Sequence, residues 1–219
     1  MKSIRLAVLA AVSVATPASA DLMKLANYNL TGAAGNEALW GGTGDSNVSS
    51  VNLVRGGGLV ASAAANSFSA SGWTGEATDY FSFGFIVDDG FIADLASLSI
   101  GTRSSGTGPG TVGVYYNGDN FTTAVGTITQ GSGTNVNTVI DLSGLTNLTG
   151  LVEFRVMAIG TNSAGGGTTS SSGTLRLTNF FEGGVNQNGF FVLGITTEIP
   201  APAVGALLAL AGVVGRRRR

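Results

Sequence analysis

The 219-residue chain is long enough for one domain with a sizeable core, and its 43% hydrophobic and 11% charged residues exclude a highly charged disordered protein. It contains no Cys and no His, which excludes disulfides, thiolate chemistry, Ser-His-Asp triads and nearly all zinc sites. Its 35 glycines lie between short apolar runs, and this pattern favours an all-β protein with many turns.

The N-terminus has the order of segments that is typical of a secretory signal: basic, apolar, then small side chains. These segments are Lys2 with Arg5, the run from Leu6 to Ala15, and Ala18 with Ala20. We therefore predict a signal peptide over residues 1–20, which signal peptidase removes after Ala20 during export. The alternative is a buried helix of the mature fold.

The remaining body of the chain is acidic. Residues 21–199 contain five basic and thirteen acidic side chains, a net charge of −8. Phosphate backbones are bound by clustered Lys and Arg, so this composition argues against a nucleic acid as the partner.

Segments with period-two alternation recur along this body, as expected for half-buried strands. The clearest is residues 79–87, which places Phe81, Phe83, Phe85 and Val87 on one face. Residues 91–103 follow the turn cluster Asp88-Asp89-Gly90, and we expect the two strands to form a hairpin. The apolar positions of the second strand change parity, which predicts a bulge near Ala96-Ser97.

A second hairpin is predicted around Asn117-Gly118, because this dipeptide favours a two-residue type I′ turn. Further strand candidates are residues 22–30, 51–57, 59–63, 135–143, 151–160, 173–181 and 188–198. Residues 143–150 are expected to form a loop. No segment has a convincing helical period, so we predict an antiparallel β-sandwich, most simply of jelly-roll type.

The C-terminal residues 199–219 read "IPAPAVGALLALAGVVGRRRR". The thirteen residues from Ala203 to Gly215 would span roughly 20 Å as a helix, which is short for a hydrocarbon core of about 30 Å. Arg216, Arg217, Arg218 and Arg219 would stop translocation and remain in the cytoplasm. This combination predicts a short hydrophobic helix that holds the protein in the inner membrane only transiently.

This tail resembles the C-terminal sorting domain of PEP-CTERM proteins, with a Pro-x-Pro motif, a short apolar helix and a terminal Arg cluster. The resemblance implies that an exosortase recognises the tail, cuts near the motif and transfers the protein to the surface or to the extracellular polysaccharide. The motif corresponds to Ile199, Pro200, Ala201 and Pro202. Ala201 replaces the glutamate that is usual in the family, which leaves open the exosortase subtype. The alternative is a plain membrane anchor.

The body also resembles a recurrent domain of planctomycete-type PEP-CTERM proteins, which has no assigned activity. The resemblance rests on "LVRGGGLVASAAANSFSASGW" (53–73), "DYFSFGF" (79–85) and "GTLRLTNFF" (173–181). We therefore divide the chain into a signal peptide (1–20), a β-sandwich domain (21–198) and a sorting tail (199–219).

Three groups of residues are candidates for ligand binding. Oxygen-rich loop residues suit calcium; these are Asp88, Asp89, Asp119 and Asn120. Arginines that alternate with apolar neighbours suit the carboxylates or sulfates of acidic polysaccharides; these are Arg103, Arg155 and Arg176. Aromatic faces suit sugars; these are Trp40, Trp73 and Tyr115-Tyr116.

Each group also has a purely structural interpretation. The acids are suited to turns, Arg155 to an ion pair with Glu153, and the aromatics to the core. Adjacent Tyr115 and Tyr116 must point to opposite faces of a strand. A glycosidase would need two of the acids Asp88, Asp89 and Asp119 in one cleft.

The sequence thus predicts an exported, non-enzymatic protein of the cell surface or extracellular matrix of a Gram-negative-type bacterium. Its expected partners are signal peptidase and an exosortase during export, the membrane before processing, and polysaccharide. The alternative is a carbohydrate-binding module, and a more remote one is a glycan-active enzyme. No cofactor is expected beyond calcium.

Overall fold

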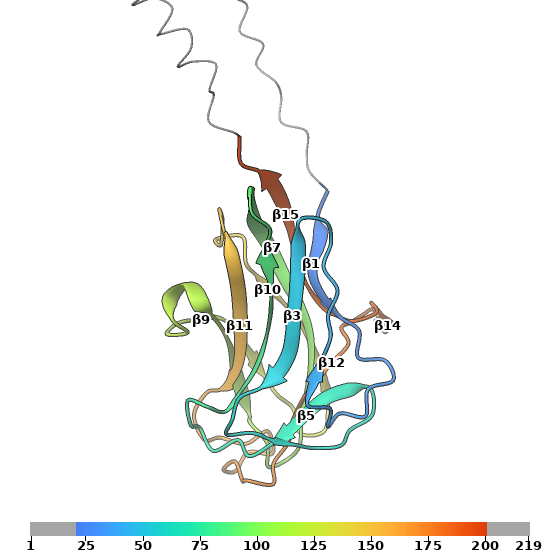
Figure 1. Ribbon diagram of the computed structural model, residues 1–219. Coiled ribbons are helices and arrows are strands. Elements are labelled where there is room, and N and C mark those ends of the chain that lie inside the picture. The colour runs from blue at the N-terminus through green and yellow to red at the C-terminus, as the bar shows by residue number, and fades with distance from the viewer. Residues whose placement is uncertain (1–20, 201–219) are drawn as a thin grey trace, which may run out of the picture.

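A computed structural model describes residues 21–200, drawn in colour in Figure 1. The predicted signal peptide with Ala18 and Ala20, and the tail from Ala201 to Arg219, lie outside the described residues. The described chain forms antiparallel sheets packed against each other, and its only helical element is the 3₁₀ turn Asn117–Asp119. Within residues 21–200 no helix has the length and apolar character needed to cross a membrane. The prediction of an all-β sandwich is confirmed.

The first sheet is organised around the long strand β7. Its order is β1-β15-β7-β12-β5-β4, and β10 pairs with the other edge of β7. The strands are β1 (Met23–Tyr28), β4 (Val60–Ala61), β5 (Ser67–Ser71), β7 (Phe91–Ser104), β10 (Asn135–Asp141), β12 (Leu175–Thr178) and β15 (Phe190–Glu198). One edge of β7 pairs first with β15 and then with β12, so these two strands lie end to end.

The second sheet has the order β2-β3-β6-β11-β8-β9. Its strands are β2 (Leu39–Trp40), β3 (Val48–Arg55), β6 (Tyr80–Val87), β8 (Thr111–Tyr116), β9 (Ala124–Thr129) and β11 (Gly150–Ala158). A small separate hairpin joins β13 (Phe181–Glu182) to β14 (Val185–Asn186).

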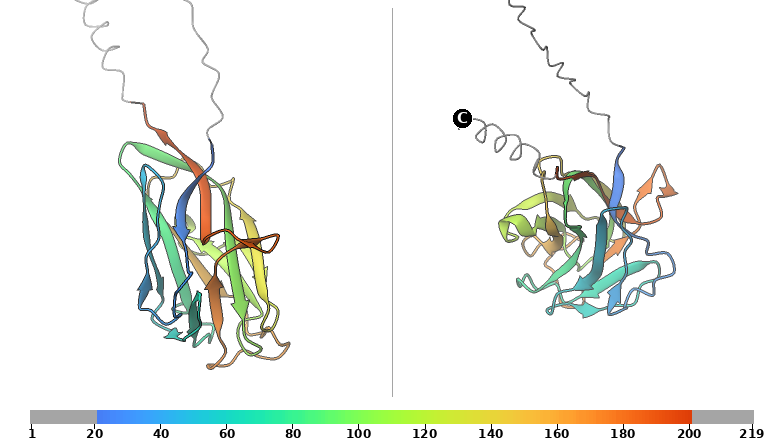
Figure 2. Two further views of the ribbon diagram at one scale, coloured as in Figure 1. Left: turned by 90° about the vertical axis from the view of Figure 1, so that its right-hand side faces the viewer. Right: turned by 45° about the horizontal axis from the view of Figure 1, so that its top comes forward.

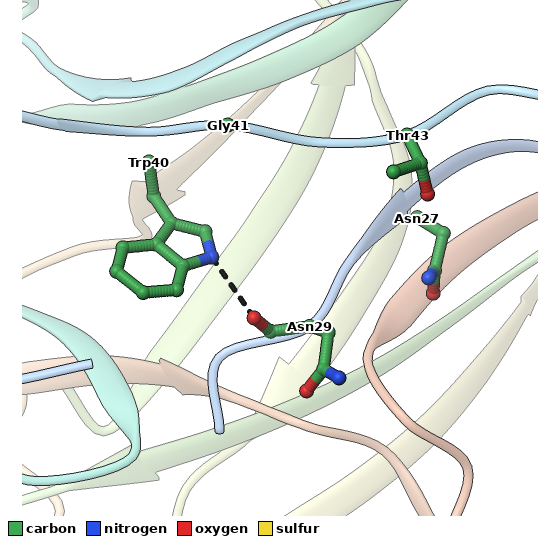
Figure 3. Close-up of a pocket in the computed structure, with 5 residues that line it drawn as sticks. All are labelled: Asn27, Asn29, Trp40, Gly41 and Thr43. Atoms are coloured by element: carbon green, nitrogen blue, oxygen red, sulfur yellow. Dashed lines mark hydrogen bonds between the residues drawn. The ribbon is translucent and has the colours of Figure 1, made fainter. Parts of the chain in front are cut away.

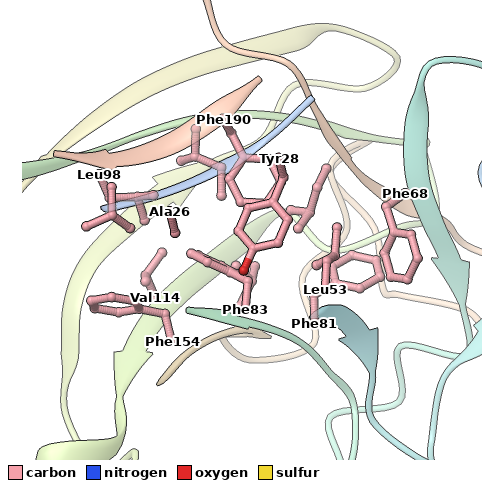
Figure 4. Close-up of a cluster of buried hydrophobic side chains, with 14 of the residues drawn as sticks. Ala26, Tyr28, Leu53, Phe68, Phe81, Phe83, Leu98, Val114, Phe154 and Phe190 are labelled. Atoms are coloured by element: carbon pink, nitrogen blue, oxygen red, sulfur yellow. The ribbon is translucent and has the colours of Figure 1, made fainter. Parts of the chain in front are cut away.

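Aromatic side chains fill the space between the sheets (Figure 4). Phe81, Phe83 and Phe85 of β6 are fully buried, as their alternation predicted. From the opposite sheet, the Tyr28 ring stacks on Phe190 at 4.9 Å between ring centroids, and the Phe190 ring meets Phe83 edge-on at 5.1 Å. This contiguous aromatic core joins the two layers.

The turn Asp88-Asp89-Gly90 does not close a hairpin. β6 belongs to the second sheet and β7 to the first, so this turn carries the chain from one layer to the other. The prediction of a hairpin is therefore wrong. β7 pairs with β15 instead, and this pairing places Phe91, Ala93 and Leu95 toward the core. The bulge is confirmed, since Leu193 opposes Ser97 whereas Gly194 opposes Leu95, which leaves Ala96 unpaired.

The hairpin of β8 and β9 is confirmed, but its tight turn is wrong. The connection contains the 3₁₀ turn and two residues of positive φ, Asn120 and Phe121. Asn117 is held elsewhere, because its amide donates to the Leu151 carbonyl and accepts from the Glu153 N–H, both at 3.0 Å. These bonds fasten the loop to β11. Residues 143–149 form a loop, as predicted, and β11 begins at Gly150.

Both ends of the described chain leave the sandwich at the same place (Figure 2). β1 and β15 are antiparallel neighbours, with Met23 opposite Gly194. We call this the terminal end. At the opposite, far end lie the loops of residues 56–59, 105–110 and 159–174.

Candidate functional site

Two of the predicted arginines lie side by side on the outer face of the first sheet. Arg103 on β7 is directly opposite Arg176 on β12, and cross-strand partners share a face. Leu175 and Leu177, which flank Arg176, are fully buried, so both arginines face away from the core. They are partly exposed and lie toward the far end of the sandwich. We call Arg103 and Arg176 the arginine pair.

The arginine pair has no counter-charge in the described part of the chain. The one ion pair among residues 21–200 joins Arg155 to Glu153, and no side-chain hydrogen bond within this range reaches Arg103 or Arg176. Partial burial and the neighbouring charge of Arg103 both lower the pKa of Arg176. Like charges directly opposite each other in a sheet are destabilising, so this arrangement costs stability unless an anion lies between them.

Two shallow hollows flank the arginine pair, and both are lined by polar groups. One, of about 150 Å³, is lined by Ala65, Asn66, Ser67, Asn135, Thr178 and Phe181 together with the pair. The other, of about 260 Å³, is lined by Ser104, Ser105, Gly106, Ser132 and Gly133 together with the pair. No Asp or Glu lines either hollow. The two positive guanidinium groups therefore lie between two uncharged hollows. The first presents amide and hydroxyl groups, and the second presents hydroxyl groups.

The other cations of the described chain are engaged in the fold. Arg55 donates to the backbone carbonyls of Gly35, Glu37 and Ser69, and its guanidinium lies 3.7 Å from the centre of the Phe68 ring. Burial lowers the pKa of Arg55, while the charge of Glu37 opposes this shift. Lys24 donates to the Gln187 carbonyl at 3.1 Å. The hydrogen-bond donors of these side chains are thus used within the fold.

Arg155 does not join the arginine pair. It lies on β11 in the second sheet, so this candidate does not share a surface with Arg103 and Arg176. Its guanidinium contacts the rings of Tyr80 and Phe121, at 4.2 and 3.8 Å from their centres. It also pairs with Glu153 at 3.0 Å, as the alternative interpretation predicted. Arg155 therefore links neighbouring side chains on the outer face of the second sheet.

A hollow of about 470 Å³ lies beside Trp40 (Figure 3). We call it the Trp40 groove; it is lined by Asn27, Asn29, Trp40, Gly41 and Thr43. The Trp40 indole N–H donates to the Asn29 carbonyl at 3.0 Å, which fixes a partly exposed ring. The Oδ1 of Asn27 is buried and has no hydrogen-bond partner among the described residues. A fixed aromatic ring beside amide groups suits a sugar.

The remaining aromatic candidates divide between core and surface. Trp73 is 1% exposed and packs edge-on against Phe81, which assigns it to the core. Tyr116 packs against Phe154 at 5.7 Å, and Tyr115 faces outward on the same strand. The prediction that these two tyrosines face opposite sides is confirmed.

The predicted calcium ligands occupy separate loops. Asp88 and Asp89 are in the turn between β6 and β7, whereas Asp119 and Asn120 follow β8. Within residues 21–200, no three acidic side chains come together in a group that could hold a metal ion. The Asp119 carboxylate accepts hydrogen bonds from the backbone N–H groups of Thr122 and Thr123. It therefore stabilises its own turn.

Sequence reasoning found both arginines of the pair but not the groups around them. Asn66, Asn135 and Ser132 come from loops and strand ends with no motif of their own, and only the sheet register brings them to the arginines. Asn27 and Asn29 likewise belong to no motif. Comparison with known proteins gives no relative: no family model, no curated protein and no solved structure matches this chain.

Proposed function

We propose that the protein is an exported, non-enzymatic component of the cell surface or extracellular polysaccharide matrix, sorted through its C-terminal tail by an exosortase. The observation that best supports the proposal is the position of the chain ends. Residue 21 lies next to the proposed signal-peptidase site, and residue 200 lies in the proposed sorting motif. Both leave the sandwich at the same end.

The folded domain ends immediately before the proposed cleavage site. The Ile199 N–H donates to the Gly90 carbonyl at 2.7 Å, while the Ile199 side chain is 46% exposed and Pro200 is exposed. A protease needs accessible backbone that no ladder holds. A cut between about Pro200 and Ala203 would release the sandwich with every hydrogen bond among residues 21–199 intact.

Tethering at one end leaves the far end free. Before cleavage, the body would be held by the terminal end, so the arginine pair would point away from the membrane. The order in which the chain visits the layers also supports a jelly-roll-like sandwich, because β7, β10 and β15 of the first sheet alternate with β8 and β11 of the second. Jelly rolls recur among lectin domains.

The sorting step is tested by expressing the full chain in a host that encodes an exosortase. We expect mass spectrometry of the surface fraction to find a protein that begins at Asp21 and ends near Pro202. The double substitution Pro200→Ala and Pro202→Ala should leave an unprocessed chain in the membrane fraction. The control Glu198→Gln changes a neighbouring exposed residue of β15 and should be processed normally.

Two results would contradict this proposal. Surface protein that retains Arg216–Arg219 would indicate a plain anchor instead of a sorting signal. Accumulation of the chain in the cytoplasm with residues 1–20 intact would exclude export altogether.

A second function, a carbohydrate-binding module, is favoured by the Trp40 groove. Its test is a glycan array probed with the wild-type protein and with Trp40→Ala. The control Leu39→Ala removes a 50% exposed apolar side chain from the same two-residue strand. Binding that is lost in Trp40→Ala and kept in Leu39→Ala would support this function, and equal binding by all three proteins would refute a role of the groove.

A further inference from the structure

We propose that the arginine pair is a binding site for the anionic groups of an acidic polysaccharide, either uronate carboxylates or sulfate esters. The inference rests on the proposed location of the protein outside the cell, where such polymers occur. It assigns the binding to Arg103 and Arg176 with their two flanking hollows, and it gives Arg155 no part in it.

The charges of the pair have no partner among residues 21–200. Among the five cations of residues 21–200, Lys24, Arg55 and Arg155 contact backbone carbonyls, aromatic rings or a carboxylate. Only Arg103 and Arg176 lack such partners in this range, and they are placed in register next to each other. The described chain contains thirteen Asp and Glu side chains, yet none lines the site. An external anion would relieve the repulsion between the two guanidiniums.

The chemistry of the guanidinium favours an anionic ligand. Its planar fork donates two parallel hydrogen bonds to a carboxylate or sulfate. Two adjacent forks present up to ten N–H donors and no acceptor, so they select for anions over neutral sugars.

The shape of the surface around the pair favours an extended ligand. Both arginines line both hollows, and a ligand that lies across the pair enters both of them. The side chains there that make no hydrogen bond within the described residues include Asn135, which is exposed and directly opposite Arg103 on β10. Amide and hydroxyl groups in the first hollow and hydroxyl groups in the second suit the hydroxyls of neighbouring sugar units. The geometry therefore fits an extended polymer better than a single ion.

A nucleic acid fits the site less well. Binding to phosphate backbones relies on larger clusters of Lys and Arg, whereas this surface has two arginines on a body of net charge −8. A polysaccharide with spaced anionic groups needs only local complementarity and tolerates this net charge better at physiological ionic strength, because distant charges are screened within about 8 Å.

The test measures binding of the full chain, in mild detergent, to immobilised polygalacturonate, dextran sulfate and neutral dextran. All proteins carry Arg216–Arg219 replaced by Gln, so that the tail does not itself bind polyanions. We expect binding to at least one of the two acidic polymers and none to dextran. Arg103→Gln and Arg176→Gln should each weaken binding by about tenfold or more, as expected for loss of a charge-assisted hydrogen bond.

Two matched variants distinguish the position and shape of the two arginines from their charge alone. Arg155→Gln removes the same charge from the other sheet and should change the affinity less than about twofold. The double variant Arg103→Lys and Arg176→Lys keeps both charges without the forks, and we expect it to recover only part of the binding. Thermal denaturation of each variant checks that the sandwich is folded.

Several outcomes would overturn the proposal. They are unchanged binding in both Arg103→Gln and Arg176→Gln, binding to dextran as strong as to the acidic polymers, and an equal loss of binding in Arg155→Gln. Tighter binding to a single-stranded oligonucleotide than to either polymer would also exclude a polysaccharide site. Selective binding to polygalacturonate or to dextran sulfate would identify the anionic group. These results are independent of the sorting experiment, since a chain that binds polygalacturonate through the pair but keeps its tail intact refutes only the proposed sorting.

Discussion

The hydroxyl group of Tyr28 connects the two sheets at a structural irregularity. The register of β3 with β6 shifts between Val51 and Val54, which marks a bulge. At this position the Tyr28 hydroxyl donates to the Val51 carbonyl at 2.6 Å and accepts from the Gly84 N–H at 3.0 Å. A side chain of β1 in the first sheet thus satisfies backbone groups of the second.

The substitution Tyr28→Phe tests this connection without opening a cavity. The ring, fully buried and stacked on Phe190, is retained. The change removes both hydrogen bonds and leaves the buried Gly84 N–H without its partner. A buried unsatisfied group costs about 1–3 kcal/mol, so we expect the free energy of unfolding to fall by about 2–3 kcal/mol and the Tm by about 5–10 °C.

The assay is equilibrium denaturation in urea, followed by the fluorescence of the buried Trp73. Tyr115→Phe is the matched control, because Tyr115 is a partly exposed tyrosine with no side-chain hydrogen bond among residues 21–200. It should change the free energy of unfolding by less than about 0.5 kcal/mol. A loss below about 0.5 kcal/mol in Tyr28→Phe, with an unchanged slope against urea, would refute the structural role of the hydroxyl.

Three further predictions concern the same sheets. Burial raises the pKa of Tyr28 above its ordinary value of 10.0, so the stability contributed by the neutral phenol is fully present below pH 10 and is lost as the pH rises above it; the alkaline decline of Tm should be shallower in Tyr28→Phe. Gly84→Ala would place a Cβ 2.0 Å from the Val152 carbonyl oxygen and should lower the free energy of unfolding by about 2–3 kcal/mol in urea denaturation. The control Gly144→Ala, with open space around it, should change this free energy by less than about 0.5 kcal/mol. Similar losses in both variants would contradict the clash. Asn117→Ala removes two bonds to β11 and should cost about 1–2 kcal/mol in the same assay, and an unchanged midpoint would show that the loop is held by other contacts.

Local alternation is enough to predict most of the long strands. The spacing of Phe81, Phe83 and Phe85 alone assigns them to the core, and the change of parity in residues 91–103 locates the bulge at Ala96. Both inferences depend on a property of single strands, namely that side chains alternate between faces.

The assignment of strands to layers is not predictable in the same way. Asp88-Asp89-Gly90 is equally compatible with a hairpin and with a crossing between sheets, because the turn chemistry is the same in both. The choice is made by β15, about a hundred residues later in the chain, which pairs with β7. The prediction of a two-residue turn at Asn117-Gly118 failed for a related reason, since the side chain of Asn117 bonds to β11 and holds the loop there.

The arginine pair shows how such long-range pairing creates a site. Arg103 and Arg176 belong to no common sequence motif. The prediction that each side chain points away from the core does not indicate the distance between them. The register of β12 decides it: burial of Leu175 and Leu177 fixes which side faces the core, and a slip by one residue would turn Arg176 inward. The position of the Arg176 charge is therefore set by the two apolar residues that flank it. Core substitutions at Leu175 or Leu177 that leave the protein folded should weaken polymer binding, although neither side chain reaches the surface.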